Sequence, residues 1–303
     1  MGDPRGIGPE VVAKALAQGL DADVALVGPD DVIGSIPAGL RIGIGEWGVG
    51  SGEWAAGLPT HHSPLPTHDV TAGRLAAVSV EVAARMALAG DVDAIVTGPV
   101  HKAALHAAGY RYPGLTEFLS HLAGDAPVAM MLAAGPLRVV LVTTHLPLRD
   151  VASTLTADLV VRAGTIARDG LRRWWGVAAP RLAVCALNPH AGEGGLFGDE
   201  DERILRPAAA ALGAAGPLPA DTVFVRALRG EFDAVLAPYH DVGMTAVKVA
   251  GFGKGVNVTL GLPFVRTAPD HGTAFDIAGK GVADASSMRA ALELALDLVR
   301  RGK

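Results

Sequence analysis

The sequence predicts an α/β protein with two domains and a cleft between them. Short apolar stretches of strand type, such as 94–97 and 234–237, alternate with longer stretches of helical type, such as 71–89 and 157–173. The 303 residues are 50% hydrophobic and 19% charged, enough to bury a large core in one big or two ordinary α/β domains. Polar residues directly follow several of the strands, and this is where ligands bind in open α/β sheets.

Composition excludes several classes of function. The formal net charge is −5 and no basic run is present, which argues against a nucleic-acid partner. No signal peptide and no apolar run of membrane length is found, and the single cysteine, Cys185, has no disulfide partner. We therefore expect a cytoplasmic protein that acts on a small molecule and binds no membrane.

Residues 1–10 form a glycine-rich loop that opens directly into a helix, with Pro9 and Glu10 in its first turn. Such a loop normally follows a strand, and no strand-like residues precede it. We therefore expect either that the assigned start of the sequence is too late or that the first strand of the sheet is missing. The glycines could hold an anionic group at the helix N-terminus, or make only a tight turn. Both interpretations stay open at this point.

Further along the chain, strands are expected at 23–28 and 40–44, followed by an irregular connection over 45–69. The histidines in this connection lack ligand spacing, and we expect them to be solvated; they are His61, His62 and His68. Thr71 is expected to cap the helix that follows.

Two positions at the starts of helices follow, one of them a candidate for anion binding. Lys102 opens a helix just after the strand 94–97, which favours anion binding over a purely solvated role. Thr116 lies in a turn after Tyr112 and Pro113, and we expect it to cap the next helix.

Histidines follow three separate apolar strands. The strands and their histidines are 137–143 with His145, 182–187 with His190, and 234–237 with His240. Each histidine alone would be interpreted as structural, but the ends of parallel strands converge on one edge of a sheet. Three neutral imidazoles there can bind one divalent metal and leave a position open for water or substrate. Asp241, next to His240, is a candidate for orienting a ligand histidine.

A second candidate site follows the tight turn at residues 270–272. Gly272 permits close approach of the backbone to a ligand, and Asp276 offers the two acceptor oxygens that a ribose diol needs. The alternative is an ordinary loop capped by an aspartate.

These stretches together resemble the 4-hydroxythreonine-4-phosphate dehydrogenase family of vitamin B6 synthesis and its catabolic relatives. The motifs that carry the resemblance cover nearly the whole chain, and in order they are GDPRGIGPE, TGPVHK, YPGLTEF, TTHLPLRDV, LNPHAGEGG, YHDVGM, GFGKGVNVTLGLPFVRT and DHGTAFDIAGKG.

The resemblance implies a homodimer of two-domain subunits with a fold like that of isocitrate and isopropylmalate dehydrogenases, and a site shared between the subunits. Residues 1–115 and 272–303 would form the first α/β domain, and residues 116–271 the second, with the metal and dimer contacts. In this fold a nicotinamide cofactor does not require a GxGxxG motif.

The resemblance also implies roles for individual residues. A divalent metal, with zinc first and magnesium or cobalt as alternatives, would bind His145, His190 and His240, the last from the partner subunit. Substrate contacts would fall on Thr116, Lys248, Asn257 and Arg266, with Lys102 added as an anion-binding residue. NAD would bind at His271, Gly272, Thr273, Ala274 and Asp276.

The implied chemistry is oxidation of a secondary alcohol followed by loss of carbon dioxide, with Lys248 and Asp241 as catalytic residues. The guanidinium group of Arg266 is suited to bind a phosphate or carboxylate group of the substrate. One departure concerns the substrate: the family usually has a phosphate-binding histidine where this chain has Leu115. The open alternatives are a threonate or erythronate phosphate, a cyclic dihydrodiol carboxylate, or, in another class, a metal hydrolase or a non-catalytic ligand-binding protein.

Overall fold

The computed structural model describes residues 1–36, 38–44 and 67–302 and divides the chain into two compact units. Unit 1 contains Met1–Ala126 and Leu262–Asp297, and unit 2 contains Pro127–Gly261 and Leu298–Lys303. The mixed α/β class is confirmed. Most of the expected irregular connection over 45–69, with His61 and His62, lies outside the described residues. None of the described helices is long and apolar enough to span a membrane.

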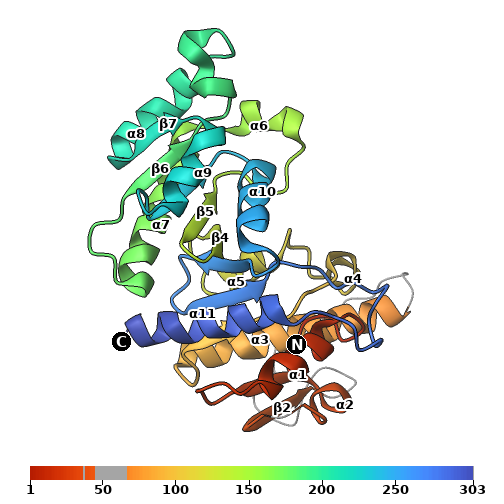
Figure 1. Ribbon diagram of the computed structural model, residues 1–303. Helices are drawn as coiled ribbons and strands as arrows, with labels where there is room; N and C mark the ends of the chain where they lie inside the picture. The colour runs from red at the N-terminus through yellow and green to blue at the C-terminus, as the bar shows by residue number, and fades with distance from the viewer. Residues whose placement is uncertain (37, 45–66, 303) are drawn as a thin grey trace. The chain divides into compact units, whose positions relative to one another are not determined.

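Unit 1 contains two pairs of parallel strands and the helices around them (Figure 1). The strands are β1 (Ala25–Pro29), β2 (Leu40–Ile44), β3 (Ala94–Val96) and β10 (Val265–Pro269). The helices are α1 (Gly8–Ala17), α2 (Asp30–Ile33), α3 (Thr67–Ala89), α4 (Lys102–Ala107), α5 (Leu115–Leu122) and α11 (Ser286–Gly302), whose last residues belong to unit 2. β1 pairs with β2, and β3 pairs with β10.

Unit 2 is built on a sheet with the strand order β9-β4-β5-β8-β6-β7. Its strands are β4 (Ala129–Ala134), β5 (Leu137–Leu141), β6 (Leu182–Cys185), β7 (Ala215–Leu218), β8 (Ala234–Ala237) and β9 (Val256–Leu260). β4 is antiparallel to both β5 and β9, whereas β5, β8, β6 and β7 run parallel to one another.

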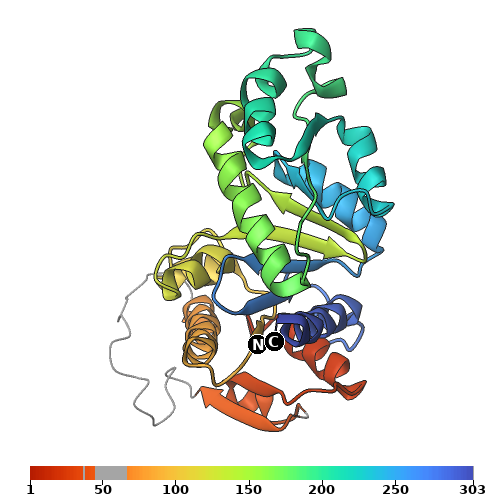
Figure 2. The same cartoon turned by 90° about the vertical axis from the view of Figure 1, so that its left-hand side faces the viewer.

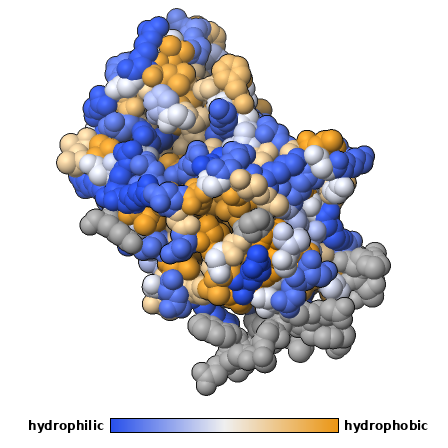
Figure 3. All heavy atoms as spheres, turned by 60° about the horizontal axis from the view of Figure 1, so that its bottom comes forward, coloured by the Kyte–Doolittle hydropathy of each residue, from blue (hydrophilic) through white to orange (hydrophobic). Residues whose placement is uncertain are grey.

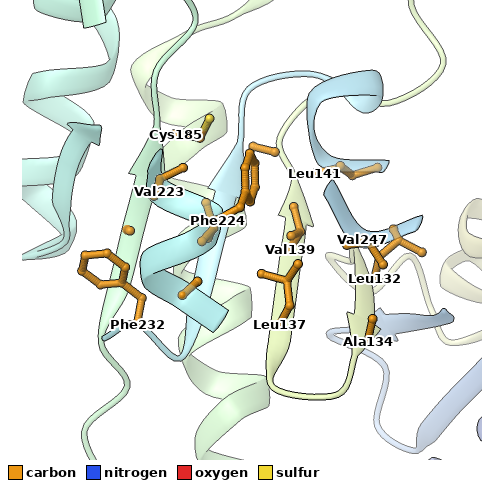
Figure 4. Packing of buried hydrophobic residues seen from close by; sticks show 14 residues of the cluster. Leu132, Ala134, Leu137, Val139, Leu141, Cys185, Val223, Phe224, Phe232 and Val247 are labelled. Carbon is orange, nitrogen blue, oxygen red and sulfur yellow. The ribbon is translucent and has the colours of Figure 1, made fainter. Parts of the chain in front are cut away.

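Helices cover both faces of this sheet. The helical segments are α6 (Leu148–Thr154), α7 (Ala157–Trp175), a turn at Pro189–Gly195, a π-helix at Asp201–Leu205, α8 (Arg206–Leu212), α9 (Ala220–Leu228) and α10 (His240–Gly251). Side chains of α9 and α10, such as Val223, Phe224 and Val247, pack on buried strand residues such as Val139 (Figure 4). α7 crosses the sheet in Figure 2, and its N-cap residue is Thr156, whose hydroxyl accepts a hydrogen bond from Leu159 N.

The unit boundaries differ from the sequence expectation of 115/116 and 271/272. α5 packs against α3, and β10 pairs with β3, so both segments belong to unit 1. The chain therefore crosses between units at 126/127 and 261/262. The end of α11 belongs to unit 2, where Gly302 lies against the ring of Trp174.

Two expected helix caps are wrong. α3 begins at Thr67, so Thr71 lies inside the helix. α5 begins at Leu115 after the N-cap residue Gly114, which leaves Thr116 as its second residue, buried in unit 1. In both places the helix starts earlier than the threonine that was expected to cap it.

Large apolar side chains are exposed close in sequence to His145 and His190 of unit 2. They are Leu146, Leu148, Leu196 and Phe197, and two more, Val249 and Phe252, lie close in sequence to Lys248. Figure 3 shows that apolar residues also reach the surface on one further face of the molecule. Clusters of exposed apolar side chains are typical of protein–protein contacts.

The close contact of α3 with α4 depends on Gly73. A Cβ at this position would overlap the backbone carbonyl of Ala104, which cannot move away as a flexible side chain could. We predict that Gly73→Ala lowers the free energy of unfolding by about 1–3 kcal/mol, although alanine is the better helix former by about 1 kcal/mol. Urea denaturation would measure this, with Gly39→Ala as the control.

At Gly39 a Cβ would lie 3.9 Å from the carbonyl oxygen of Val24, an ordinary contact, so this variant should stay close to wild type. Equal stability of the two variants would contradict the assignment of Gly73 to close helix packing.

Candidate active site

Three neighbouring parallel strands of unit 2 lead to the three histidines. β8 lies between β5 and β6 and is parallel to both. The histidine that follows each strand is His145 after β5, His240 after β8 and His190 after β6. The carboxyl ends of these strands therefore share one edge of the sheet, as ligand sites in α/β proteins require.

Two of the three histidines lie side by side. The ring centroids of His145 and His240 are 5.7 Å apart. Nδ1 of His240 lies 2.7 Å from a carboxylate oxygen of Asp241. With Nδ1–H donating to that carboxylate, Nε2 keeps its lone pair for a metal or a proton, which is the arrangement that orients ligand histidines. Among the residues that the structure describes, no group of three histidine, cysteine or acidic side chains of one chain could hold a metal ion.

His190 lies in an unusual backbone segment, which we call the left-handed turn, residues 190–195. All six residues have positive φ, from 41° at Glu193 to 94° at Gly195. Three of them are glycines, but His190, Ala191 and Glu193 are not. A left-handed conformation costs such a residue about 1–2 kcal/mol, so the surrounding structure must hold this turn.

Asp201 holds the chain at the entrance to the left-handed turn. Its side chain is fully buried, and its two oxygens accept hydrogen bonds from Leu187 N at 2.9 Å and Asn188 N at 3.0 Å. The side-chain amide nitrogen of Asn188 donates a hydrogen bond to a carboxylate oxygen of Glu200 at 2.8 Å. These contacts fix the backbone two residues before His190.

The other expected residues of unit 2 lie on α10 and β9. Lys248 is exposed two turns after His240 on α10. Asn257 lies on β9, and its side-chain oxygen is buried without a hydrogen-bond partner. Because buried polar atoms in native proteins are almost always hydrogen-bonded, this oxygen favours a donor group from a ligand.

In unit 1, Arg266 is a buried cation. It lies on β10, which sequence reasoning missed as a strand, and only 4% of its surface is exposed. One guanidinium nitrogen donates to the hydroxyl of Thr97 at 2.7 Å, and Thr97 is held next to β10 by its backbone bond to Thr267. Burial lowers the pKa of Arg266 to about 10, partly offset by the charge of Glu117, so the side chain stays protonated at neutral pH. A buried cation favours an anionic ligand.

The helix starts in unit 1 place further candidates. Lys102 is exposed at the first residue of α4, and Leu115 and Thr116 are buried at the start of α5. The side chains of Lys102 and Glu117 both reach Gly114, where a Cβ would lie 4.0 Å from Lys102 Cε and 3.2 Å from Glu117 Oε2.

The loop 271–283, which contains the expected cofactor residues, packs on the N-terminal glycine loop. Ile7 N donates to Thr273 O at 2.9 Å, and a Cβ at Gly6 would lie 2.8 Å from that same oxygen. The ring of Phe275 lies 5.5 Å from the guanidinium of Arg5 and 5.1 Å from the ring of His101. Gly6 is therefore required for close packing of two loops that are far apart in sequence.

The remaining cofactor candidates lie along the same loop. His271 and Thr273 are partly buried, Gly272 and Asp276 are exposed, and Ala274 has a φ of 43°. Nδ1 of His271 contacts Gly272 O at 3.0 Å, and its Nε2 is buried without a hydrogen-bond partner.

Comparison with known proteins identifies the family. The profile described as "Pyridoxal phosphate biosynthetic protein PdxA" matches residues 55–295. The chain belongs to the PdxA family. A 4-hydroxythreonine-4-phosphate dehydrogenase of Beijerinckia indica is 45% identical, with 98% of this chain and 93% of the relative covered. A D-threonate 4-phosphate dehydrogenase of Cupriavidus necator is also 45% identical, with 99% and 96% covered.

A solved structure of a PdxA relative shows the same fold. The crystal structure of the 4-hydroxythreonine-4-phosphate dehydrogenase of Klebsiella pneumoniae matches with a TM-score of 0.83 and 40% identity, covering 99% of this chain and 98% of that one. The family that the sequence motifs predicted is thus confirmed. Sequence reasoning missed Arg5, Asp201 and the left-handed turn, for which the glycines of AGEGG were the only available signal.

We predict that Asp201→Asn loosens the left-handed turn. An asparagine side chain has one acceptor oxygen and would place an N–H donor against one of the two backbone donors, a loss of about 1–3 kcal/mol. Hydrogen exchange of the amides of residues 187–195 should become faster. Asp199→Asn, which alters only an exposed contact with Arg203, is the control and should exchange like wild type. Unchanged exchange in Asp201→Asn would show that the turn does not depend on this carboxylate.

Proposed function

We propose that this PdxA-family enzyme uses NAD and a divalent metal to oxidise and decarboxylate a phosphorylated 3-hydroxy acid. The substrate is 4-hydroxythreonine 4-phosphate or a close analogue, as the names of the relatives indicate. The observation that carries the proposal is the pair of adjacent histidines, His145 and His240, at the ends of neighbouring parallel strands. A cytoplasmic location suits an enzyme that uses this cofactor.

The side chains at this edge of the sheet have the chemistry of divalent-metal ligands, and, because no three of them in the described part of one chain are grouped closely enough, a second chain would complete the site. His145, His190 and His240 would hold the metal, and Asp241 already contacts Nδ1 of His240, which leaves Nε2 as the atom that would bind it. Three imidazoles suit zinc, with magnesium or cobalt as alternatives. Such an ion, when bound, lowers the pKa of the substrate hydroxyl and stabilises negative charge on the oxygen.

The chain's own residues bind the substrate and move one proton. Oxidation transfers a hydride from the carbinol carbon to NAD and releases the hydroxyl proton, which gives a β-keto acid. Its carboxylate then leaves as carbon dioxide, and Lys248 donates a proton to the carbon that held it. Asn257 offers its unpartnered side-chain oxygen to a hydroxyl or ammonium group of the substrate.

Arg266, Thr116 and Lys102 would hold the anionic groups of the substrate. The guanidinium group of Arg266 is buried and donates a hydrogen bond to the hydroxyl of Thr97. Its planar arrangement of N–H donors matches the oxygens of a phosphate or carboxylate group. Thr116 adds a hydroxyl donor, and Lys102 a positive charge at the surface.

NAD would bind at the loop that contains His271, Gly272, Thr273, Ala274 and Asp276. Asp276 is exposed in the turn at 275–279, where its carboxylate can accept hydrogen bonds from both ribose hydroxyls. We further propose a homodimer in which the partner subunit completes the metal site. The family resemblance assigns His240 to the second chain, whereas the 5.7 Å between the rings of His145 and His240 supports a pair from one subunit. The exposed apolar residues Leu146, Leu148, Leu196 and Phe197, close in sequence to His145 and His190, support a contact between subunits.

A second candidate substrate is D-threonate 4-phosphate, which the relative from Cupriavidus necator is named for; Leu115 bears on the phosphate that both acids carry. This buried leucine offers no hydrogen bond to a phosphate where many relatives are expected to have histidine. The deciding experiment measures NADH formation and carbon dioxide release with each acid and zinc. One carbon dioxide per NADH is expected. No NADH with either acid, or NADH without carbon dioxide, would refute the proposed reaction.

Cofactor choice tests the role of Asp276. Two like charges roughly 4 Å apart repel by on the order of 4 kcal/mol at an effective dielectric constant of about 20, before screening. The wild type should therefore prefer NAD to NADP by at least about a hundredfold in kcat/KM, and Asp276→Asn should lose most of this preference. Asp284→Asn, which removes a carboxylate bonded to Ser286, is the control. Equal use of both cofactors by the wild type would place Asp276 away from the ribose.

Substrate choice tests Leu115. A histidine can donate a charge-assisted hydrogen bond to phosphate worth about 1.5–3 kcal/mol, or roughly ten- to a hundredfold in affinity. Leu115→His should shift kcat/KM toward 4-hydroxythreonine 4-phosphate over a cyclic dihydrodiol carboxylate, which carries no phosphate, whereas Leu115→Met should leave the ratio unchanged. If both variants behave alike, this position does not select the substrate.

A further inference from the structure

An ion pair on α1 fixes the end of the loop 271–283. Lys14 Nζ donates hydrogen bonds to Gly281 O at 2.9 Å, to Ala283 O at 2.8 Å and to a carboxylate oxygen of Glu10 at 2.8 Å. An ammonium group has three N–H donors, so all of its hydrogen-bonding capacity is used here.

Glu10 completes the contact from the other side. The same carboxylate oxygen that pairs with Lys14 also accepts a hydrogen bond from Ala283 N at 2.8 Å. The backbone of Ala283 is thus held at its N–H by Glu10 and at its carbonyl by Lys14. The hydrogen bond from Lys14 is the main cause of a lowered pKa of Glu10, so this carboxyl group stays ionised at neutral pH.

The same face of α1 also holds the beginning of the loop. Ile7 N binds Thr273 O, and residues 7, 10, 11 and 14 are spaced so that they share one side of a helix. The loop residues Ala274, Ile277 and Ala278 pack on the apolar cluster that includes Ile7 and Val11. One helix face therefore anchors the loop at both ends and along its middle.

Between these anchors, two hydrogen bonds order the loop from within, Ile277 N to Ala274 O and Lys280 N to Ile277 O. Asp276 lies exposed between them. A loop that is already ordered loses less conformational entropy when it binds a ligand, so external anchors can raise affinity without touching the ligand.

We propose that Glu10 and Lys14 are positioning residues for the nicotinamide cofactor. They hold the loop 271–283 in the shape that presents Asp276 and its neighbours to the adenosine part of NAD. This inference rests on the proposed function of that loop, and neither residue contacts the cofactor itself.

Steady-state kinetics with Lys14→Met and Glu10→Gln test the proposal. The KM for NAD should rise about tenfold in each variant while kcat at saturating NAD stays within about twofold, because the reacting groups are untouched. Lys14→Arg keeps the charge and several donors and should restore most of the affinity. Glu202→Gln is the matched control. Glu202 forms an ion pair with Arg206 at the same i,i+4 spacing, but this pair lies far along the chain from the loop 271–283.

Hydrogen exchange in the absence of NAD separates this inference from the proposed function. Amides of residues 277–283 should exchange at least about tenfold faster in Lys14→Met and Glu10→Gln than in wild type or Glu202→Gln. Faster exchange with an unchanged KM for NAD would overturn the positioning role alone, as would wild-type exchange in both variants. A wild-type protein that binds no NAD by fluorescence titration would instead overturn the proposed function on which the inference rests.

Discussion

The parallel pairing of β5, β8 and β6 is the constraint on which the candidate metal site depends. Hydrogen bonds between these strands place their carboxyl ends along one edge, so the chain must leave the sheet three times at nearly the same place. Each exit carries a histidine, and two of these rings meet. The third, His190, is presented by a left-handed turn that Asp201 anchors from a buried position. Backbone pairing and one buried carboxylate together determine where the imidazoles lie.

In unit 1, too, neighbouring elements hold the candidate binding residues in place. Pairing of β3 with β10 brings Thr97 against Arg266 and keeps a protonated guanidinium in a buried position that favours an anion. Separately, α1 packs its apolar face and its Glu10–Lys14 pair on the loop 271–283. The residues that would contact substrate and cofactor are thus few, and each depends on a neighbouring element that contacts neither.

Sequence reasoning could identify the parts of the site that follow from strand periodicity. His145, His190 and His240 were predictable because each follows an apolar run, and the ends of parallel strands converge. Asp201 was not predictable, because its contacts reach back to Leu187 and Asn188 through a turn whose handedness no local pattern specifies. Arg266 was recognised as an anchor, but its strand was missed, since short strands depend on their partners more than on their own residues. The division into units differs from the expected domains for a related reason: pairing of β10 with β3 is a long-range contact.

The most direct test of a metal centre at His145, His190 and His240 is the metal content of the His190→Ala variant. Purified wild type, His190→Ala and the control His121→Ala would be analysed for bound zinc and for turnover. The ring of His121 contacts Asp125 and Tyr112 on the surface of unit 1. Loss of one histidine from a three-histidine site should nearly abolish both quantities, while His121→Ala keeps them. Full metal occupancy with normal turnover in His190→Ala would contradict a centre built on these three strand ends.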